Sequence, residues 1–348
     1  MLVSDFDFDL PENLIAQEPS ARGSSRLLVL DRRTGAVEHA SVADLPSFLA
    51  AGDLMVVNNS RVFAARLLGH RTPSGGSVEC LLVRRTGEPD VWEALMHPGQ
   101  KLKPGGHVRF EGAAGGLTGE ILDRHFFGRR TIRLSADAGG NVDELIDTLG
   151  HMPLPPYIKR PDTAADRERY QTVYATVRGS IAAPTAGLHF TPELLSALAS
   201  RGIERAAVTL HVGYGTFKPV RVEEVESHVV DPEEYEIDPG VVEAIGRAKN
   251  GGHRVVVVGT TTTRALEDAA ARGGGKVVAG AAQATTFIYP GFRFQVADAL
   301  MTNFHLPKSS LLMLVAAFAG REQVLAAYRE AVARRYRFYS YGDAMLIL

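Results

Sequence analysis

Cysteine is almost absent from this sequence. Cys80 is the only one among 348 residues, so a disulfide framework within the chain is excluded, and so is a zinc site built on several cysteines. That usage fits a reducing compartment. The segment from Met1 to Asp9 is acidic and alternating, unlike a signal peptide, and the longest apolar run, Leu311 to Ala319, is too short to span a bilayer. We therefore expect a soluble, cytoplasmic protein without a membrane partner.

Three widespread motifs are missing as well. The chain contains no Gly-x-Gly-x-x-Gly dinucleotide fingerprint, no P-loop and no Gly-x-Ser-x-Gly nucleophile elbow. Cys80 lies in a strand-like run, which favours a small buried hydrophobe over a nucleophile. The formal net charge is -2, which argues against non-specific binding of polyanions but not against a local basic patch for RNA phosphates.

The length and the 45% hydrophobic content predict about two domains. Between Arg66 and Leu134, short runs of β-type residues alternate with Gly and Pro signals, a pattern typical of a small antiparallel barrel or sandwich. A short helix is expected from Asn141 to Leu149. The rest of the chain alternates strand and helix, so it reads as α/β. We predict an α/β main domain, residues 1–62 plus 153–348, with a small antiparallel β-barrel domain inserted at 63–152.

The α/β part has clear element signals. Thr191 is a plausible N-cap, followed by Pro192 at the first helical position and Gly202 as a stop. The expected strands are 206–211 and 254–258, and the expected helices are 191–201, 241–249 and 263–272; segments 311–319 and 321–336 look helical or mixed.

Several polar islands interrupt the apolar pattern. Thr302, Asn303 and His305 stand between two apolar runs, so they form either a well-satisfied turn or part of a site. The small residues of Gly179 to Thr191 either admit a flat ligand close to the backbone or pack a loop against a helix. The Gly-rich loop of Thr209 to Phe217 follows a strand, where α/β sheets commonly bind ligands.

A run of four threonines, Thr260 to Thr263, joins a buried strand to a helix. Free N–H groups at a helix start, with hydroxyls beside them, suit a carboxylate or phosphate, although N-capping by one threonine is the alternative. His228, Asp231, Glu233 and Glu234 could in principle bind a metal, but spacing alone sets no ligand geometry, and we expect a solvated acidic loop there.

These segments together resemble the S-adenosylmethionine:tRNA ribosyltransferase-isomerase family of queuosine biosynthesis. The resemblance extends over nearly the full length, with the β-rich region matching in pattern more than in residues. Departures occur at Asp231, where a second histidine is frequent, and at Tyr214 and Ala284. The matching blocks are Asp5–Glu12, Gly52–Arg61, Gly150–Ile158, Asp166–Tyr174, Ala182–Phe190, Thr209–Phe217, Phe287–Phe292, Thr302–Pro307 and Tyr336–Met345.

The resemblance implies a reaction. Members of this family transfer and isomerise the ribosyl part of S-adenosylmethionine onto 7-aminomethyl-7-deazaguanine at the wobble position of tRNA. The product is epoxyqueuosine-tRNA, and adenine and methionine are released. The implied partners are S-adenosylmethionine, as co-substrate, and a tRNA with a GUN anticodon carrying the deazaguanine precursor. No metal and no redox cofactor are expected.

The resemblance also suggests roles for residues in the matching blocks. As acid–base groups we predict His189, His211 and His305, with Glu233 as a weaker candidate base. For substrate binding we predict a methionine carboxylate site at Thr260, Thr261, Thr262, Thr263 and Arg264, ribose or wobble-base contacts at Asn58, Asn59 and Arg61, further contacts at Thr185 and Asn303, and base stacking on Tyr170, Tyr174 and Tyr341.

Two alternatives remain open. A different S-adenosylmethionine-dependent RNA-modifying enzyme, such as a methyltransferase, is disfavoured by the missing Gly-rich nucleotide loop. A non-catalytic tRNA-binding protein is disfavoured by the near-neutral charge.

Overall fold

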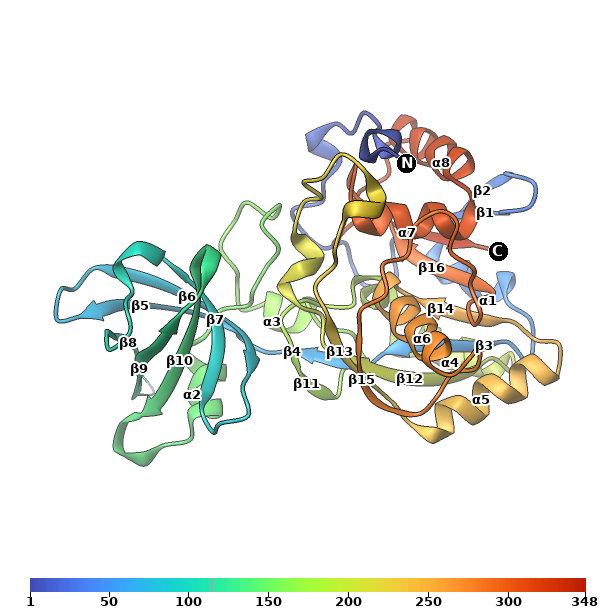
Figure 1. Ribbon diagram of the computed structural model, residues 1–348. Coiled ribbons are helices and arrows are strands. Elements are labelled where there is room, and N and C mark those ends of the chain that lie inside the picture. The colour runs from blue at the N-terminus through green and yellow to red at the C-terminus, as the bar shows by residue number, and fades with distance from the viewer. Residues whose placement is uncertain (114) are drawn as a thin grey trace.

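The computed structural model describes residues 1–113 and 115–348, and it forms two lobes (Figure 1). A closed β-barrel makes up one lobe. A large mixed sheet with helices makes up the other, which also contains both ends of the chain. The predicted fold class, an α/β domain with an inserted antiparallel barrel, is confirmed.

The barrel is built from six antiparallel strands. Inward-facing residues alternate with outward-facing ones, as Val78, Cys80 and Leu82 show by pointing into the barrel core. Cys80 is fully buried, and burial raises the pKa of its thiol, so the prediction of a small hydrophobe is confirmed. In barrel order the strands are β10 (Arg129–Ala136), β7 (Val91–His97), β6 (Ser77–Arg85), β5 (Arg66–Thr72), β8 (His107–Gly112) and β9 (Gly115–Arg124).

Helix α2 (Val142–Leu149) packs on the barrel. Its N-cap is Asn141, whose side-chain oxygen accepts hydrogen bonds from two backbone N–H groups of the first turn. Val142 and Ile146 add their side chains to the barrel core. Because the barrel has its own apolar core, we propose the division of the chain into domains that the sequence predicts.

The α/β lobe contains a nine-stranded sheet. Four adjacent central strands run parallel, namely β12 (Glu204–Leu210), β3 (Leu54–Asn58), β14 (Val255–Val258) and β16 (Ala299–Asn303). Beyond β12 lie the antiparallel strands β13 (Glu233–Ile237) and β15 (Gly280–Ala284), and beyond β16 lie β17 (Ala344–Ile347), β1 (Arg26–Leu30) and β2 (Val37–Ser41). A separate two-stranded ribbon joins β4 (Ser60–Val62) to β11 (Val177–Ser180).

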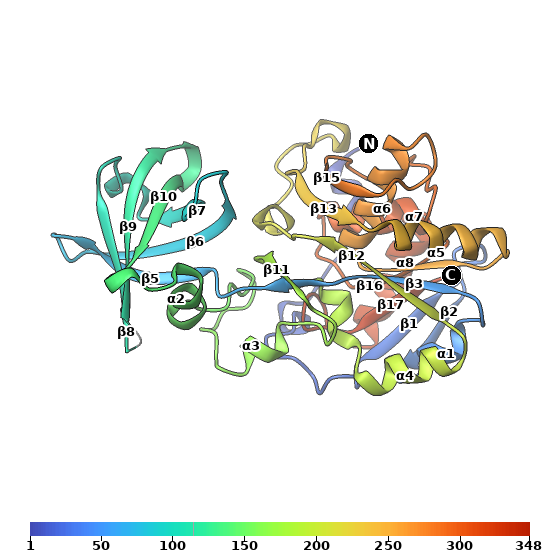
Figure 2. The same cartoon turned by 90° about the horizontal axis from the view of Figure 1, so that it is seen from below.

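Helices cover both faces of this sheet (Figure 2). In β3, Leu54 and Val56 belong to the apolar core on one face, and Met55 and Val57 to the core on the other, which explains the continuous apolar run. The first core is completed by α5 (Pro239–Asn250), α6 (Thr260–Arg272), α7 (Ser310–Ala319) and α8 (Arg321–Ala333), and the second by α1 (Leu45–Phe48) and α4 (Pro192–Ser200). The predicted helices in these segments are confirmed, although α6 starts three residues before the predicted Thr263.

Helices α7 and α8 are the most apolar consecutive pair. No single helix in the described ranges is long and apolar enough to cross a membrane; this pair meets the criterion only together, bent by 115°.

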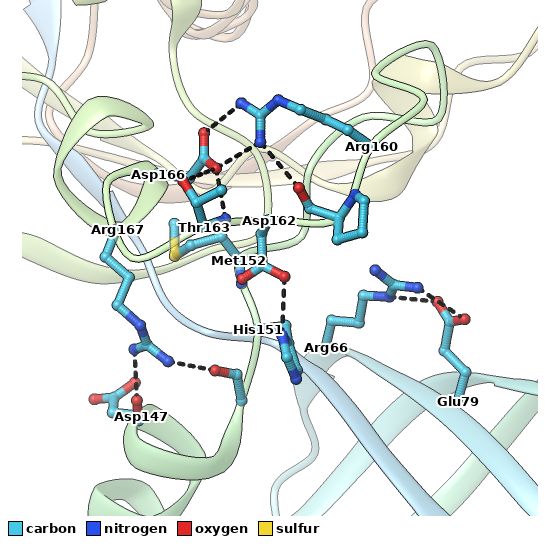
Figure 3. Close-up of polar contacts among 12 residues, drawn as sticks. Arg66, Glu79, Asp147, His151, Met152, Arg160, Asp162, Thr163, Asp166 and Arg167 are labelled. Atoms are coloured by element: carbon cyan, nitrogen blue, oxygen red, sulfur yellow. Dashed lines mark hydrogen bonds and ion pairs between the residues drawn. The ribbon is translucent and has the colours of Figure 1, made fainter. Parts of the chain in front are cut away.

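Two chain segments connect the lobes, and they pair with each other. Arg66, at the start of β5, and His151, after α2, exchange backbone hydrogen bonds of 3.3 and 2.8 Å. Figure 3 shows the His151 ring pointing at Asp162, whose carboxylate lies 2.8 Å from Nδ1 and also accepts the N–H of Met152. Nearby, Asp166 of α3 (Asp166–Arg169) accepts two hydrogen bonds from the guanidinium of Arg160. Paired backbone and buried carboxylates therefore brace the junction.

The carboxyl end of β3 is locked by Asn58. Its side-chain nitrogen donates to the carbonyl of Leu210 at 2.9 Å, and its oxygen accepts the N–H groups of Leu210 and Ser60 at 3.1 and 3.0 Å. One buried amide thus joins β3, β4 and the end of β12.

We predict that Asn58→Ala lowers the free energy of unfolding by about 2–4 kcal/mol, because it leaves buried backbone groups without partners. Chemical denaturation measures this. The matched control is Asn59→Ala at the half-buried next position, where the side-chain oxygen accepts a hydrogen bond from Thr209, and it should cost less. Equal losses in the two variants would contradict the structural role of Asn58.

Candidate functional site

A cavity lies at the carboxyl end of the four parallel strands; we call it the inner cavity. Small residues, Ala182 to Ala186, form one wall and leave the backbone accessible. Other walls come from the start of α6 after β14, from the end of β16 and from the chain just before β17. Polar side chains from segments far apart in the sequence line it, namely Tyr157, Thr185, Thr216, Thr260, Thr261, Thr302, Asn303, His305, Tyr339 and Ser340.

The four threonines of α6 fall into two pairs. The hydroxyl of Thr262 donates to the carbonyl of Val258 at 2.6 Å, and that of Thr263 donates to the carbonyl of Gly259 at 3.0 Å. Both therefore bind the turn before the helix. Thr260 and Thr261 instead line the cavity, beside the free N–H groups of the helix start. Only the first pair of hydroxyls is placed to meet a ligand.

The two polar atoms of the Asn303 side chain differ in their surroundings. Its side-chain nitrogen donates to the carbonyl of Tyr339 at 2.9 Å. Tyr339 has φ 75°, a strained conformation for a residue with a side chain, and this bond helps to hold it. The Asn303 side-chain oxygen is buried and makes no well-formed hydrogen bond within residues 1–113 and 115–348, but the side chain acts on the ring of His189 and partly offsets the lowering of its pKa by burial. A buried acceptor at a cavity wall suits a ligand N–H group.

His305 lies in the inner cavity in a neutral state. Its Nε2 is 2.9 Å from the hydroxyl of Thr302, and its backbone N–H donates to the hydroxyl of Tyr328 at 3.1 Å. Burial lowers its pKa to about 3. At neutral pH the ring is therefore uncharged, and its lowered pKa makes it a weak proton acceptor.

A second cavity, the outer cavity, adjoins the first. Both cavities are lined by Thr216, Thr260, Thr261 and Leu311, so they share a wall. Glu233 and Arg264 also line the outer cavity.

Glu233 is buried at the start of β13 and faces this cavity. Its carboxylate accepts hydrogen bonds from the N–H of Gly213 at 2.9 Å and from the hydroxyl of Thr216 at 3.3 Å, and Arg264 lies 2.8 Å away. Burial raises the pKa of Glu233 in spite of the Arg264 charge. The expected solvated acidic loop is therefore wrong for Glu233, although Glu234 is exposed.

The guanidinium of Arg264 has several protein acceptors. Besides Glu233, it donates to the carbonyls of Thr286 at 3.0 Å and of Asp231 and Ala284 at 2.7 Å each. Arg264 therefore positions Glu233, and it is less available to a substrate carboxylate than the sequence prediction required.

His211 lies in a third hollow, the interdomain groove, between the barrel and the α/β lobe. The groove is also lined by Arg178, Tyr214, Asp231 and Glu233, so it reaches the outer cavity. Burial lowers the pKa of His211, an effect that Glu234 and Glu236 partly offset. Nδ1 of the ring has no hydrogen-bond partner in the part of the chain described.

Other candidates lie outside these three hollows. Asn58 and Asn59 bind β12, and Arg61 is exposed on β4. His189 is buried, with Nδ1 3.0 Å from the hydroxyl of Ser25, and burial lowers its pKa to about 4. Its contribution to a site would be indirect.

The tyrosines predicted to stack on bases require a correction. Tyr170 is fully buried, and Tyr341 is buried with its hydroxyl donating to Asp166 at 2.9 Å. Neither ring can stack on an RNA base in this conformation. Tyr174 is half-buried against Phe190, with ring centroids 6.2 Å apart.

The residues of the inner cavity that were given no predicted role include Tyr157, Tyr339 and Ser340. Tyr157 and Tyr339 meet edge to face with centroids 3.8 Å apart, and the hydroxyl of Tyr157 hydrogen-bonds Ser340. All three lie within matching sequence blocks, which was the one available signal. In residues 1–113 and 115–348, no group of three or more His, Cys, Asp or Glu side chains is arranged to hold a metal ion.

Comparison with known proteins decides the family. A family model described as queuosine biosynthesis protein matches residues 3–347. The chain belongs to this family. Relatives of the chain include two named S-adenosylmethionine:tRNA ribosyltransferase-isomerase, from Heliobacterium modesticaldum at 53% identity and Desulfitobacterium hafniense at 50%, each aligned over 100% of both chains.

A solved structure agrees with this assignment. The crystal structure of S-adenosylmethionine tRNA ribosyltransferase from Thermotoga maritima is similar to this chain, with a TM-score of 0.55 and 38% identity over 99% of this chain and 100% of that one.

Because His305 is buried and neutral, we predict that the stability of the fold decreases at acidic pH. Because the folded pKa of His305 is about 3 and an unfolded histidine titrates near 6.5, the unfolded state binds more protons between these values. The contribution of His305 to the free energy of unfolding should therefore be at its maximum above pH 6.5 and decrease as the pH drops toward 3. In His305→Asn the fall should be shallower, as denaturant titrations at pH 7 and 5 would show. Val278→Ala, which removes no titrating group, is the control, and an unchanged slope in His305→Asn would contradict the argument.

Proposed function

We propose that this chain transfers and isomerises the ribosyl part of S-adenosylmethionine onto 7-aminomethyl-7-deazaguanine at the wobble position of a tRNA with a GUN anticodon. Epoxyqueuosine-tRNA, adenine and methionine are the products. The reaction takes place in the cytoplasm and uses no metal or redox cofactor. The observation that carries the proposal is the convergence of Thr260, Asn303, His305 and Glu233 on two adjoining cavities. The names of the full-length relatives support it.

S-adenosylmethionine occupies the two cavities. The flat adenine lies in the inner cavity against the small residues Ala182 to Ala186, where the Asn303 oxygen accepts a hydrogen bond from its amino group. The methionine carboxylate lies at the start of α6, near the N–H groups and hydroxyls of Thr260 and Thr261. Arg264 acts on Glu233 instead of on this carboxylate.

The proposed reaction requires a general base, a proton donor for adenine and a site from which water is excluded. The sulfonium acidifies C5′, and a base removes a proton there. The sugar ring then opens, and adenine leaves with the electrons of its glycosidic bond and takes up a proton. The neutral tRNA amine adds to C4′ of the opened sugar and loses a proton, and the displaced electrons form a bond from C5′ to the C1′ carbonyl carbon. The alkoxide formed there closes the epoxide at C5′ as methionine departs with the electrons of the C5′–S bond. Closed walls keep water from these intermediates.

Glu233 is the base that the geometry favours. Its carboxylate is buried at the boundary between the outer cavity and the interdomain groove, and a raised pKa makes it a stronger base. His305 on the inner side is a weaker candidate base, because burial lowers its pKa, and His211 flanks the entry of the tRNA amine. Loss of adenine release in Glu233→Gln, with Glu236→Gln on the exposed side of β13 as control, tests this role.

The decisive experiment is a product analysis. The chain is incubated with S-adenosylmethionine and a tRNA carrying the aminomethyl-deazaguanine, and the nucleosides and small molecules are identified by mass spectrometry. We expect epoxyqueuosine with adenine and methionine. S-adenosylhomocysteine would identify a methyltransferase instead, and tRNA binding without consumption of S-adenosylmethionine would identify a binding protein.

The division of the threonines gives a sharper prediction. In Thr260→Val with Thr261→Val, the loss of two ligand-facing hydroxyls should raise the KM for S-adenosylmethionine about tenfold, at roughly 0.5–1.5 kcal/mol for each hydrogen bond. Thr262→Val makes the same chemical change one position further along, and it should lower thermal stability with the KM unchanged. Steady-state kinetics and a melting curve separate the two effects, and a larger rise in KM for Thr262→Val would refute the assignment.

A further inference from the structure

Two phenylalanines stand out from the barrel on the turn between β9 and β10. Phe126 is 86% exposed and Phe127 is 95% exposed, and both belong to η5 (Phe126–Gly128). We call this turn, residues 125–128, the aromatic tip. The two ring centroids are 6.5 Å apart and the planes are tilted by 49°, so neither ring covers the face of the other. Two adjacent aromatic rings in water point to a binding partner.

The aromatic tip is held in place from below. The guanidinium of Arg130 is buried and donates to the carbonyls of Leu102 at 2.9 Å, Arg129 at 2.6 Å and His125 at 3.4 Å, and also to the carbonyl of Gly99. Phe127 adopts φ 55°, a left-handed conformation that this bonding helps to fix. The rings therefore project from an ordered turn, so little conformational entropy would be lost when they bind.

The surface around the tip favours an anion. A groove beside it, the tip groove, is lined by Arg124, His125 and Arg130. Its carboxylate, Glu79, is already bonded to Arg66 at 2.7 Å. Across the ranges that the structure describes, neither Arg124 nor Arg130 forms an ion pair with a carboxylate. Exposed aromatic faces beside the guanidinium group of Arg124 match unpaired RNA, which offers stacking bases and phosphates.

The tip groove leads toward the reaction site. Tyr214 lines both the tip groove and the interdomain groove, and Glu233 lines both the interdomain groove and the outer cavity. Arg129, directly after the tip, lies 3.6 Å from Asp231 of the α/β lobe. A nucleic acid strand on the tip would thus be continuous with the cavities.

We propose that the aromatic tip binds the anticodon loop of the tRNA substrate, with unpaired bases next to the wobble nucleotide stacked on Phe126 and Phe127. This inference rests on the proposed function, and it gives the inserted barrel a role in holding RNA. Arg124 attracts the loop backbone, while the buried Arg130 only holds the turn in place, and the wobble base extends through the interdomain groove to Glu233. Stacking is thereby assigned to exposed rings in place of the buried Tyr170 and Tyr341.

The test is the double variant Phe126→Ala, Phe127→Ala of the full chain. Alanine substitution of a stacking ring weakens RNA binding by about 5- to 150-fold per base, so the KM for precursor tRNA should rise at least about tenfold. The kcat and the KM for S-adenosylmethionine should change less than about twofold, because both cavities stay intact. Val278→Ala, a 43% exposed apolar residue outside the three hollows and the tip groove, is the matched control and should change neither constant.

Two further variants distinguish stacking from general apolar contact. Phe126→Trp with Phe127→Trp should retain the low KM, whereas Phe126→Leu with Phe127→Leu should raise it like the alanine pair. A leucine pair that matches the wild type would overturn the proposal in favour of an apolar partner such as a protein. An unchanged KM in the alanine pair would overturn it as well.

Direct binding separates this proposal from the proposed function. An anticodon stem–loop RNA with 2-aminopurine next to the wobble position should lose fluorescence on binding the wild type, and this quenching should be lost in the alanine pair. Wild-type protein that consumes no S-adenosylmethionine but shows this difference would refute the reaction and support the tip. Active wild type with equal quenching in both proteins would refute the tip alone.

Discussion

The candidate site depends on the parallel alignment of β12, β3, β14 and β16. Parallel neighbours in register bring their carboxyl ends to one edge, so the residues that follow each strand meet there. The antiparallel strands β13 and β17 contribute the residues at their starts, because each begins beside the end of its parallel neighbour, β12 or β16. Glu233 at the start of β13 and Tyr339 shortly before β17 therefore reach the same edge as Thr260 and Asn303.

Burial at this edge determines the protonation states. Desolvation raises the pKa of Glu233 and lowers the pKa of His305. The Glu233 carboxylate therefore becomes a stronger base, whereas His305 stays neutral. A buried ion pair stabilises a fold poorly unless hydrogen bonds offset the desolvation of both charges. Glu233 and Arg264 meet that condition through Gly213, Thr216 and backbone carbonyls, which keeps an ionisable group in a dry place.

The sequence predicted what depends on local pattern and missed what depends on distant pairing. Alternating runs between Gly and Pro turns predicted the barrel, and an apolar run before four threonines predicted the start of a helix. The orientation of each threonine depends on where α6 begins, which was misplaced by three residues. Tyrosine fits core and surface equally well, so the burial of Tyr170 could not be read from its type. Strands β1 and β17 pair across almost the whole chain, a contact that no local signal reveals.

The junction between the lobes, like the register of the sheet, holds residues from separate segments at fixed positions relative to one another. An enzyme that holds RNA on one lobe and modifies a base on the other needs a fixed distance between the two places. Here the barrel is attached by two segments that hydrogen-bond each other at Arg66 and His151, and Asp162 bonds the His151 ring. Arg129 of the barrel approaches Asp231, two residues from Glu233. Contacts at the lobe junction and between Arg129 and Asp231 thus fix the barrel relative to the carboxyl edge, so a stacked anticodon loop would present its wobble base to one place.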